Sequence, residues 1–222
     1  MAGRMVDFSS NGQRTQGYLA TPGSGSGPGV VVIQEWWGLV PHIKDVADRF
    51  ASAGFVALAP DLYHGKAARE PNEAQKLMME LDIQRAGKDM AGAVAYLRSQ
   101  HAVTPKKVGC VGFCMGGGLT LYLASMGVVD AAAPFYGVLR NQPDWRGVKC
   151  PIEGHYAERD GATDGLPKVK EALQAAGKQA TFHIYPGTQH AFFNNERPQV
   201  YNAESAKLAW DRTLAFFRKN LK

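Results

Sequence analysis

The sequence predicts an α/β protein with a mostly parallel sheet that helices cover on both faces. Short, continuous apolar runs alternate along the 222 residues with longer segments that have the amphipathic period of a helix. Strands separated by helices need crossover connections, which make the strands parallel and place helices on both faces of the sheet. No linker or shift in composition divides the chain, so residues 1–222 are expected to form a single domain.

The first elements follow from apolar patterning and from glycine. The Gly-Ser-rich stretch Gly23–Gly27 is expected to be a loop between two strands. Gly29–Gln34 contains a continuous β-branched run, which is typical of a strand buried on both faces. In Pro41–Ala53, apolar residues recur at the spacing of one helical face, and Gly54 stands where a helix C-cap is expected. Phe55–Pro60 is the next buried strand.

The same alternation continues to the end of the chain. Further strands are expected at residues 107–112, 131–135, 150–155 and 180–185. Further helices are expected at residues 83–97, 115–125, 166–176 and 202–221, and the last of these is amphipathic. In sheets of this class the ligand site lies beyond the carboxyl ends of the strands, so we expect the chemistry in the segments that follow the strands.

Composition and charge exclude several classes of function. No run approaches the roughly 18 apolar residues of a membrane span, and the first residues lack the apolar stretch of a signal peptide, so we expect a cytoplasmic protein without a membrane partner. The net charge of +5 is scattered and often paired with acids, which argues against nucleic-acid binding but could draw anionic small molecules to a cleft. The three cysteines form no disulfide or zinc framework, and Cys110 and Cys150 are expected to be buried.

Residues Gly112–Gly116 read G-F-C-M-G, which is the pattern G-x-nucleophile-x-G, directly after an apolar run. A nucleophile between two glycines at a strand-to-helix turn needs a backbone so tight that a Cβ at either flanking position would clash. The turn raises the side chain above the sheet and directs the N–H groups of the next helix to the same point, which favours anions. Cys114 is therefore the candidate nucleophile, and it indicates covalent acyl chemistry through sulfur.

Such a nucleophile needs an acid and a histidine later in the chain, in that order. His190 follows the last expected sheet strand, where an imidazole can reach the turn. Asp160 precedes a glycine in the turn after the strand expected at residues 150–155, and it is expected to orient His190. Glu158 and Asp164 also qualify by position. Alternatively, Asp160 only forms the turn. The other histidines are expected on solvated helical segments (His42 and His101), in a loop (His64) or in structural positions within strands (His155 and His183).

The loop after the first buried strand, Gln34–Gly38, places a carboxylate and two tryptophans at the mouth of the expected site. In proteins with this turn, the loop supplies one oxyanion N–H and the residue after the nucleophile supplies the other; here these are Trp36 and Met115. Glu35 cannot donate while ionised, so near Cys114 it would accept the thiol proton or keep the thiol protonated at rest. Alternatively, Glu35 is a surface glutamate beside a structural pair of tryptophans.

With Cys114, Asp160 and His190 in this order behind Gln34–Gly38, the chain resembles the dienelactone hydrolase (carboxymethylenebutenolidase) family over nearly its whole length. The resemblance also rests on the motifs Pro60-Asp61-Leu62-Tyr63, Phe135-Tyr136-Gly137 and His190-Ala191-Phe192. It implies the α/β-hydrolase fold, a triad of these three residues, and opening of lactone or ester bonds without a metal or an organic cofactor. Cys114 would then attack a small-molecule substrate, and His190 would activate the water that hydrolyses the thioester.

The resemblance also assigns Glu35 to a switch, in which the thiol rests against the carboxylate and ionises when an anionic substrate arrives. The best-known members of the family bind the dienelactone carboxylate with two arginines, and the second of these positions is Asn194 here. Arg197 lies three residues beyond it, and Arg69 lies close to the first position but out of register. The substrate pocket is expected to include Trp37, Tyr63, Arg69, Tyr136, Phe192 and Arg197.

Three functions are compatible with these observations. The first is a cysteine-dependent hydrolase of small, anionic lactones or esters, and the second is a broad carboxylesterase that acts on neutral esters through the same triad. The third is a non-catalytic thiol protein, in which Cys114 senses oxidants or binds a ligand. The intact triad favours the first two, because sensing gives no reason for His190 and Asp160 in those loops. We expect a monomer or a small homo-oligomer.

Overall fold

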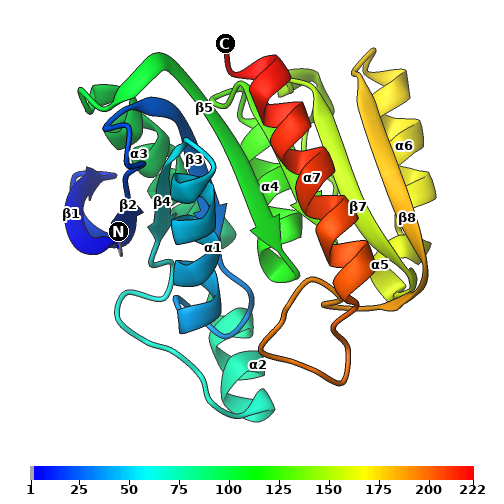
Figure 1. Ribbon diagram of the computed structural model, residues 1–222. Coiled ribbons are helices and arrows are strands. Elements are labelled where there is room, and N and C mark those ends of the chain that lie inside the picture. The colour runs from blue at the N-terminus through cyan, green and yellow to red at the C-terminus, as the bar shows by residue number, and fades with distance from the viewer. Residues whose placement is uncertain (1–2) are drawn as a thin grey trace.

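The computed structural model describes residues 3–222 and contains a single eight-stranded sheet (Figure 1). The strands are β1 (Arg4–Ser10), β2 (Gln13–Ala20), β3 (Gly27–Ile33), β4 (Val56–Pro60), β5 (Val103–Phe113), β6 (Ala131–Phe135), β7 (Ile152–Arg159) and β8 (Ala180–Gln189). Their order in the sheet is β1-β2-β4-β3-β5-β6-β7-β8. β2 is antiparallel to both of its neighbours, and all other neighbouring strands are parallel.

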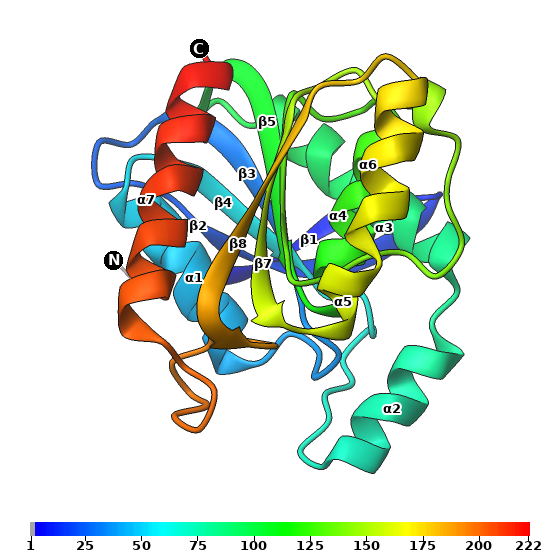
Figure 2. The ribbon, with the colours of Figure 1, turned by 90° about the vertical axis from the view of Figure 1, so that its right-hand side faces the viewer.

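Helices cover both faces of the sheet, which confirms the predicted α/β architecture. They are α1 (Pro41–Ser52), α2 (Pro71–Glu80), α3 (Ile83–Ser99), α4 (Met115–Ser125), α5 (Gly161–Asp164), α6 (Leu166–Ala175) and α7 (Ala203–Asn220). α1 and α7 lie on one face, and α3, α4 and α6 lie on the other, as Figures 1 and 2 show from two directions. α2 stands out beyond the carboxyl ends of the strands. None of the helices in residues 3–222 has the length and apolar character needed to cross a membrane.

The central strands are buried on both faces because their apolar residues do not alternate with polar ones. Val30 and Val32 of β3 pack in the core beneath α1 and α7, whereas Val31 and Ile33 pack in the core beneath α3 and α4. Burial of each such side chain contributes roughly 1.5–3 kcal/mol. A shift of the register would misplace the side chains that pack in both cores, and the register in turn fixes where each loop begins.

Three elements, β1, β2 and α2, gave only weak signals in the sequence. β1 and β2 form a hairpin whose residues largely alternate between exposed and buried, and its turn at Asn11 and Gly12 has positive φ at both residues. α2 buries only Ala74, so it carries little of the periodic apolar pattern of a packed helix. The predicted loop at Gly23–Gly27 is confirmed, since it connects β2 to β3 and its last residue begins β3.

β7 and β8 extend further toward their carboxyl ends than their apolar runs predicted. The expected ends were residues 155 and 185, whereas the strands end at Arg159 and Gln189, and these two residues are paired across the ladder. Tyr156 and Ala157 are buried, but Glu158, Arg159 and most of residues 186–189 are exposed, so pairing continues past the end of the apolar pattern. Asp160 and His190 are therefore the first residues after two adjacent, paired strand ends.

Buried sulfur and imidazole groups lie close to the sheet. Cys110 and Cys150 are buried and free, as predicted. His42 lies on α1, but the prediction of a solvated position is wrong, because its side chain is only 1% exposed. It occupies the inner face of that helix, with its ring centroid 6.3 Å from that of Phe113 and 6.5 Å from that of Phe193.

Candidate active site

Cys114 lies at the turn between β5 and α4, in a backbone conformation that few side chains adopt. Its φ is 56° and its ψ is −117°. This conformation turns the chain directly from the strand into the helix, and the first N–H groups of that helix have no partner within it. The sulfur therefore lies where the helix terminus favours a negative charge.

Close backbone contacts require the two glycines of the turn. A Cβ on Gly112 would lie 2.2 Å from the Gly116 carbonyl oxygen, and a Cβ on Gly116 would lie 2.5 Å from two carbonyl oxygens at the end of β3. Hydrogen bonds hold the turn in place: the Cys114 N–H donates to the Phe135 carbonyl at 3.1 Å, and the Gly117 N–H donates to the Cys114 carbonyl at 2.9 Å. The nucleophile position is thus fixed by the sheet on both sides.

Asp160 and His190 meet across the ends of β7 and β8. Nδ1 of His190 lies 2.8 Å from Oδ2 of Asp160. The other oxygen of Asp160 accepts a hydrogen bond of 3.0 Å from the Ala162 N–H, so the same side chain caps the short helix α5. Glu158, an alternative acid by position, instead accepts a hydrogen bond from the Gly187 N–H. Asp160 therefore both forms the turn, by capping α5, and holds His190, so the two roles considered for it are not alternatives.

The environment of His190 favours its charged form. Burial alone would lower the pKa, but the hydrogen bond to Asp160 and the interaction with the Cys114 sulfur raise the pKa of His190 to about 10. Because Nδ1 faces Asp160, Nε2 is the atom left for the sulfur or for a substrate. The side chain is 40% exposed, so a bound molecule can reach it.

The loop between β3 and α1 is held beside the nucleophile by hydrogen bonds. The Tyr63 hydroxyl donates to the Trp36 carbonyl at 3.1 Å and contacts the Met115 sulfur at 3.4 Å. The Ala68 N–H donates to the Trp37 carbonyl at 2.9 Å, and the two tryptophan rings pack edge to face, 5.1 Å apart. Tyr63, predicted as a pocket residue, thus uses its hydroxyl to position the loop. An oxyanion hole made of the Trp36 and Met115 N–H groups would need these two residues to lie close together, and the Tyr63 hydroxyl contacts both of them.

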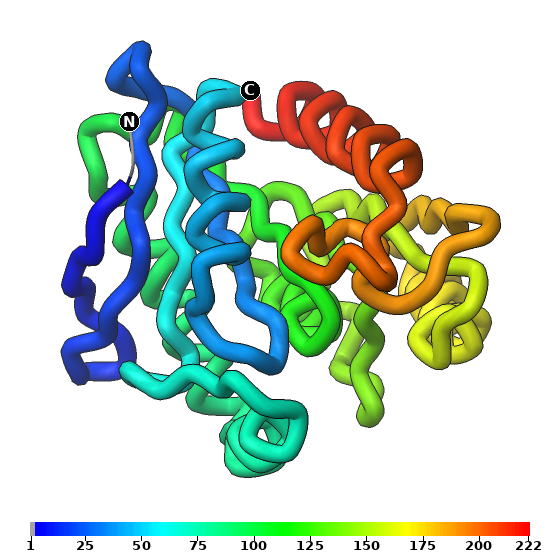
Figure 3. Tube along the Cα trace, turned by 60° about the horizontal axis from the view of Figure 1, so that its bottom comes forward, coloured from blue at the N-terminus to red at the C-terminus, as the bar shows by residue number. Residues whose placement is uncertain are grey.

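Glu35 is buried rather than on the surface, with 1% of its side chain exposed. Its Oε2 accepts a hydrogen bond of 2.9 Å from the Asn194 amide, and its Oε1 has no hydrogen-bond partner among residues 3–222. Burial raises the pKa of Glu35, and the Asn194 hydrogen bond and the charges of His190 and Arg197 oppose this only in part. The carboxyl group thus joins the loop after β3 to the segment after β8, which lie side by side in Figure 3.

The remaining predicted pocket residues differ in exposure. Tyr136 is fully buried, and its ring centroid lies 5.2 Å from that of His190 and 5.5 Å from that of Phe192. Phe192 is also fully buried, because the chain turns inward after His190, so it packs in the core instead of facing an open pocket. Arg69 is exposed and Arg197 is half-buried. Of these two arginines, Arg197 is the one whose charge acts on Glu35.

Sequence reasoning missed a chain of buried hydrogen bonds that joins β7, β8 and α7. Nδ1 of His155 lies 2.8 Å from the Tyr185 hydroxyl, and its Nε2 lies 3.0 Å from the Thr213 hydroxyl. Arg212 donates to the same Tyr185 hydroxyl at 3.2 Å. Burial lowers the pKa of His155, so its ring is neutral, and its two hydrogen bonds tie α7 to β7 and β8. No local pattern could reveal these contacts, because they join three separate elements.

The described part of the chain offers no metal centre. Among residues 3–222, no group of three or more His, Cys, Asp or Glu side chains is placed to hold an ion. The groups assembled at the carboxyl end of the sheet are a thiol, an imidazole and carboxyl groups, which together can perform nucleophilic and acid-base chemistry.

Comparison with known proteins identifies the family. A model of the dienelactone hydrolase family matches residues 15–221. "Protein usf" of Aquifex pyrophilus is 41% identical over 230 residues, which cover 99% of this chain and 99% of that protein. A Bradyrhizobium protein named "Probable 2-oxo-3-(5-oxofuran-2-ylidene)propanoate lactonase" is 33% identical, covering 97% of this chain and 94% of its own length. The solved dienelactone hydrolase of Anabaena variabilis shares the fold, with a TM-score of 0.72 at 22% identity and full coverage of both chains.

The match to the family model and the identity to relatives along almost the whole chain agree with the motifs and with the α/β architecture. Members of this family hydrolyse lactone or ester bonds. The chain belongs to the dienelactone hydrolase family and is a lactone or ester hydrolase.

Proposed function

We propose that this protein hydrolyses small lactones or esters through an acyl-enzyme on Cys114, and that it prefers substrates that carry a carboxylate. The proposal rests on one observation above all: the Asp160–His190 pair faces the Cys114 turn at the same end of the sheet, with His190 favoured as an imidazolium. This arrangement supplies a nucleophile, a proton donor and a group that orients the donor.

Acylation begins with the thiolate of Cys114 beside the imidazolium of His190. The sulfur attacks the carbonyl carbon, and the oxyanion is stabilised by the N–H groups of Met115 and Trp36. The carbon–oxygen bond then breaks, and the leaving oxygen takes the proton from Nε2 of His190. The products of this half-reaction are a thioester on Cys114 and a neutral imidazole.

Deacylation uses the same imidazole as a base. Once the sulfur is acylated, its negative charge no longer raises the pKa of His190, and only Asp160 continues to do so. The ring can then accept a proton from water, and the resulting hydroxide attacks the thioester. The thiolate leaves, the acid product departs, and His190 again holds the proton beside Cys114. One water molecule is consumed in each cycle.

Positive charge near the site supports the preference for anionic substrates. Arg197 follows His190 on the same segment, and Arg69 lies on the segment whose backbone pairs with the Trp37 loop. The Bradyrhizobium relative bears the name of a lactonase for a propanoate. A carboxylate on the substrate would be drawn toward these guanidinium groups.

A second candidate function is a carboxylesterase for neutral esters. It is favoured by Asn194, since a neutral amide, not a cation, is the partner that Glu35 has in the buried part of the site. In this case neither arginine would contribute to substrate binding.

Two substrates and two variants separate these functions. We expect a lactone with a free carboxylate to have a higher kcat/KM than its uncharged carboxamide analogue, and Arg197→Gln to lower only the former, by about tenfold or more. Arg69→Gln serves as the matched control for loss of a more exposed charge. Equal kcat/KM values for both lactones, unchanged by either variant, would indicate the neutral esterase. Absence of turnover for lactones and aryl esters alike would contradict the proposal as a whole.

A further inference from the structure

The β4 turn, which we define as residues 61–66 after strand β4, sends two neighbouring side chains to different parts of the molecule. The Asp61 carboxylate closes the turn by accepting hydrogen bonds from the Tyr63 N–H at 3.1 Å and from the Gly65 N–H at 2.6 Å. The Tyr63 hydroxyl contacts the loop that follows β3, whereas the His64 ring contacts α3. The β4 turn therefore joins the candidate active site to α3 through a single peptide bond.

His64 has a backbone conformation that its side-chain contact helps to maintain. Its φ is 52°, in the left-handed region that few residues other than glycine adopt, although histidine and asparagine tolerate it better than most. Such a conformation costs free energy and persists where neighbouring contacts support it. The contact available to the ring is with α3, where Nε2 of His64 lies 3.1 Å from Oδ2 of Asp89.

Asp89 is a buried carboxylate, with 4% of its side chain exposed. Its Oδ1 accepts hydrogen bonds from the Ser10 hydroxyl at 2.6 Å and from the Thr15 hydroxyl at 3.5 Å. Its Oδ2 has the distance of an ion pair to His64 but not the angles of a hydrogen bond. Burying a carboxylate is costly unless its charge is compensated, so a protonated His64 stabilises Asp89 mainly through its charge.

Two other basic residues lie near this pair but do not replace His64. Lys66 and Arg85 line a cavity of about 290 Å³ that Asp89 and His64 also line. Neither forms an ion pair with Asp89 in the part of the chain that the structure describes, and Arg85 donates a hydrogen bond to the Gln13 side chain instead. Among residues 3–222, His64 is therefore the one basic side chain at ion-pair distance from this carboxylate.

The β4 turn connects this ion pair to the proposed oxyanion hole. The Tyr63 hydroxyl donates to the Trp36 carbonyl at 3.1 Å and contacts the Met115 sulfur at 3.4 Å, and the N–H groups of these two residues are the proposed oxyanion donors. We propose that the Asp89–His64 ion pair positions the oxyanion hole by fixing the β4 turn and, with it, the Tyr63 hydroxyl. Small displacements of an oxyanion donor weaken the stabilisation of the transition state. This inference rests on the proposed function and makes both members of the pair positioning residues.

Steady-state hydrolysis of an aryl ester by two single variants tests the positioning role. His64→Asn keeps a residue that tolerates positive φ and removes the imidazole, and Asp89→Asn keeps an oxygen for the Ser10 hydroxyl and removes the charge. Each is expected to lower kcat about tenfold and to leave KM nearly unchanged, because the oxyanion hole serves the transition states of both half-reactions and not the bound ester. His101→Asn, which removes an exposed imidazole, is the matched control and should retain the wild-type kcat.

A double-mutant cycle with Tyr63→Phe measures whether the ion pair acts through the tyrosine. His64→Asn should lower kcat about tenfold in the wild-type background and by less than about twofold in the Tyr63→Phe background, because the hydroxyl that it positions is then absent. Equal reductions in both backgrounds would overturn the inference, since a general structural effect does not depend on that hydroxyl. Urea unfolding of every variant confirms that folded proteins are compared.

Failure of this inference and failure of the proposed function give different results. Wild-type protein that forms no acyl adduct on Cys114 and hydrolyses no ester would contradict the proposed function. Wild-type protein that forms the adduct, together with an undiminished kcat in folded His64→Asn, would overturn only the role assigned to the Asp89–His64 ion pair.

Discussion

At the scale of single residues, the site depends on side chains that serve structure and chemistry together. Asp160 caps α5 with one oxygen and holds His190 with the other. Tyr63 is part of the core, and its hydroxyl positions the loop that carries Trp36. Because the Asp160 carboxylate and the Tyr63 hydroxyl each have two partners, the geometry exists before a substrate arrives, which is the form of preorganisation that acyl transfer needs.

The Asp160–His190 contact predicts a specific pH dependence. In the wild type, the imidazolium should persist to about pH 10, where kcat/KM should fall as His190 loses its proton. Asp160→Asn keeps an N-cap side chain for α5 but removes the charge, so the pKa of His190 should drop and the alkaline limb should move down by about one pH unit or more. The pH profiles of kcat/KM for the two proteins measure this shift.

The control for this prediction is Glu158→Gln, which removes a neighbouring carboxylate that bonds the Gly187 N–H and not the imidazole. Its alkaline limb should coincide with that of the wild type. An unchanged alkaline limb in Asp160→Asn would contradict the role assigned to that carboxylate.

The sequence could predict those parts of the candidate site whose residues lie close together along the chain. Cys114 is marked by its own neighbours, and the order of Asp160 and His190 follows from the type of turn. No neighbouring residue indicates the partner of Glu35, because Asn194 lies 159 positions after Glu35 and contacts it only in the folded protein. Sequence reasoning therefore could not name Asn194 as the hydrogen-bond partner of Glu35, and its alternative of a surface glutamate is wrong because Glu35 is buried.

At the scale of secondary-structure elements, the strand-to-helix turn between β5 and α4 is the feature most sensitive to small changes. Gly112→Ala should destabilise the protein by about 3 kcal/mol or abolish folding, since the added Cβ would overlap a backbone oxygen that cannot rotate away. Gly23→Ala is the matched control, because a Cβ there meets no atom within 4 Å. Urea unfolding of both variants measures the difference, and equal stabilities would show that the turn can relax.

The elements themselves were predictable to different degrees, for physical reasons. Strands buried on both faces, such as β3, carry a continuous apolar run and were located from it. At the ends of β7 and β8, Arg159 and Gln189 pair across the ladder while both residues are exposed, so apolar composition does not mark these strand ends. This extension determines the site, because it brings Asp160 and His190 to the ends of adjacent, paired strands.

At the scale of the whole molecule, the protein carries imidazoles that its interior keeps neutral. Burial, together with the charge of Arg49, lowers the pKa of His42 from 6.5 to about 4. As the pH falls, His42 therefore becomes protonated in the unfolded chain before it does so in the folded protein. The stability contributed by neutral His42 is fully present above pH 6.5 and is lost progressively toward pH 4, to a total of ~3 kcal/mol. His155 acts in the same direction.

We expect His42→Leu to flatten the decline of unfolding free energy between pH 6.5 and 4, because the variant has no proton to take up at this position. Neither ring nitrogen of His42 meets a partner at good hydrogen-bond geometry within residues 3–222, and the Asn195 side chain opposes the lowered pKa only weakly, so the substitution removes little hydrogen bonding. Chemical denaturation at a series of pH values measures the slope. The exposed His101 provides the control as His101→Leu, and an identical slope in wild type and His42→Leu would refute the prediction.

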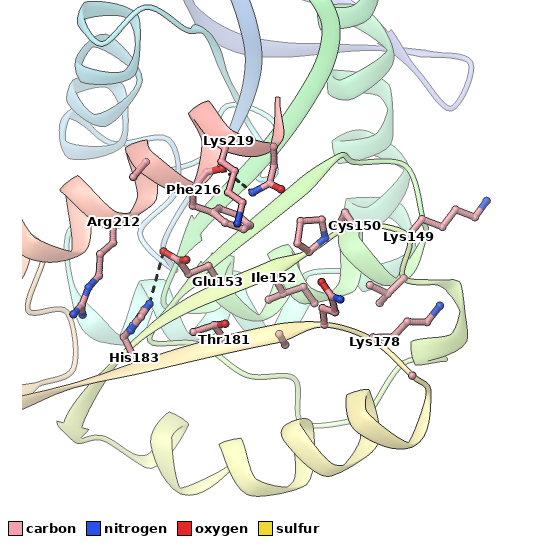
Figure 4. A pocket seen from close by; sticks show the side chains of 17 residues that line it. Lys149, Cys150, Ile152, Glu153, Lys178, Thr181, His183, Arg212, Phe216 and Lys219 are labelled. Atoms are coloured by element: carbon pink, nitrogen blue, oxygen red, sulfur yellow. Dashed lines mark hydrogen bonds and ion pairs between the residues drawn. The ribbon is translucent and has the colours of Figure 1, made fainter. Parts of the chain in front are cut away.

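The two ends of β7 and β8 differ in their surroundings. Their carboxyl ends lead into Asp160 and His190, and their amino-terminal parts border a cavity whose lining includes Arg212 and Lys219 (Figure 4). The hydrogen-bonded chain of Arg212, Tyr185 and His155 lies between these two regions.

The most direct test of the central claim is intact-protein mass spectrometry within the first turnover of an activated aryl ester or lactone, followed by peptide mapping. The account predicts one acyl group per chain, located on Cys114 and absent from Cys110 and Cys150, whose thiols are buried. It also predicts that Cys114→Ala folds normally and forms no adduct. An adduct on another residue, or undiminished turnover by Cys114→Ala, would contradict the account.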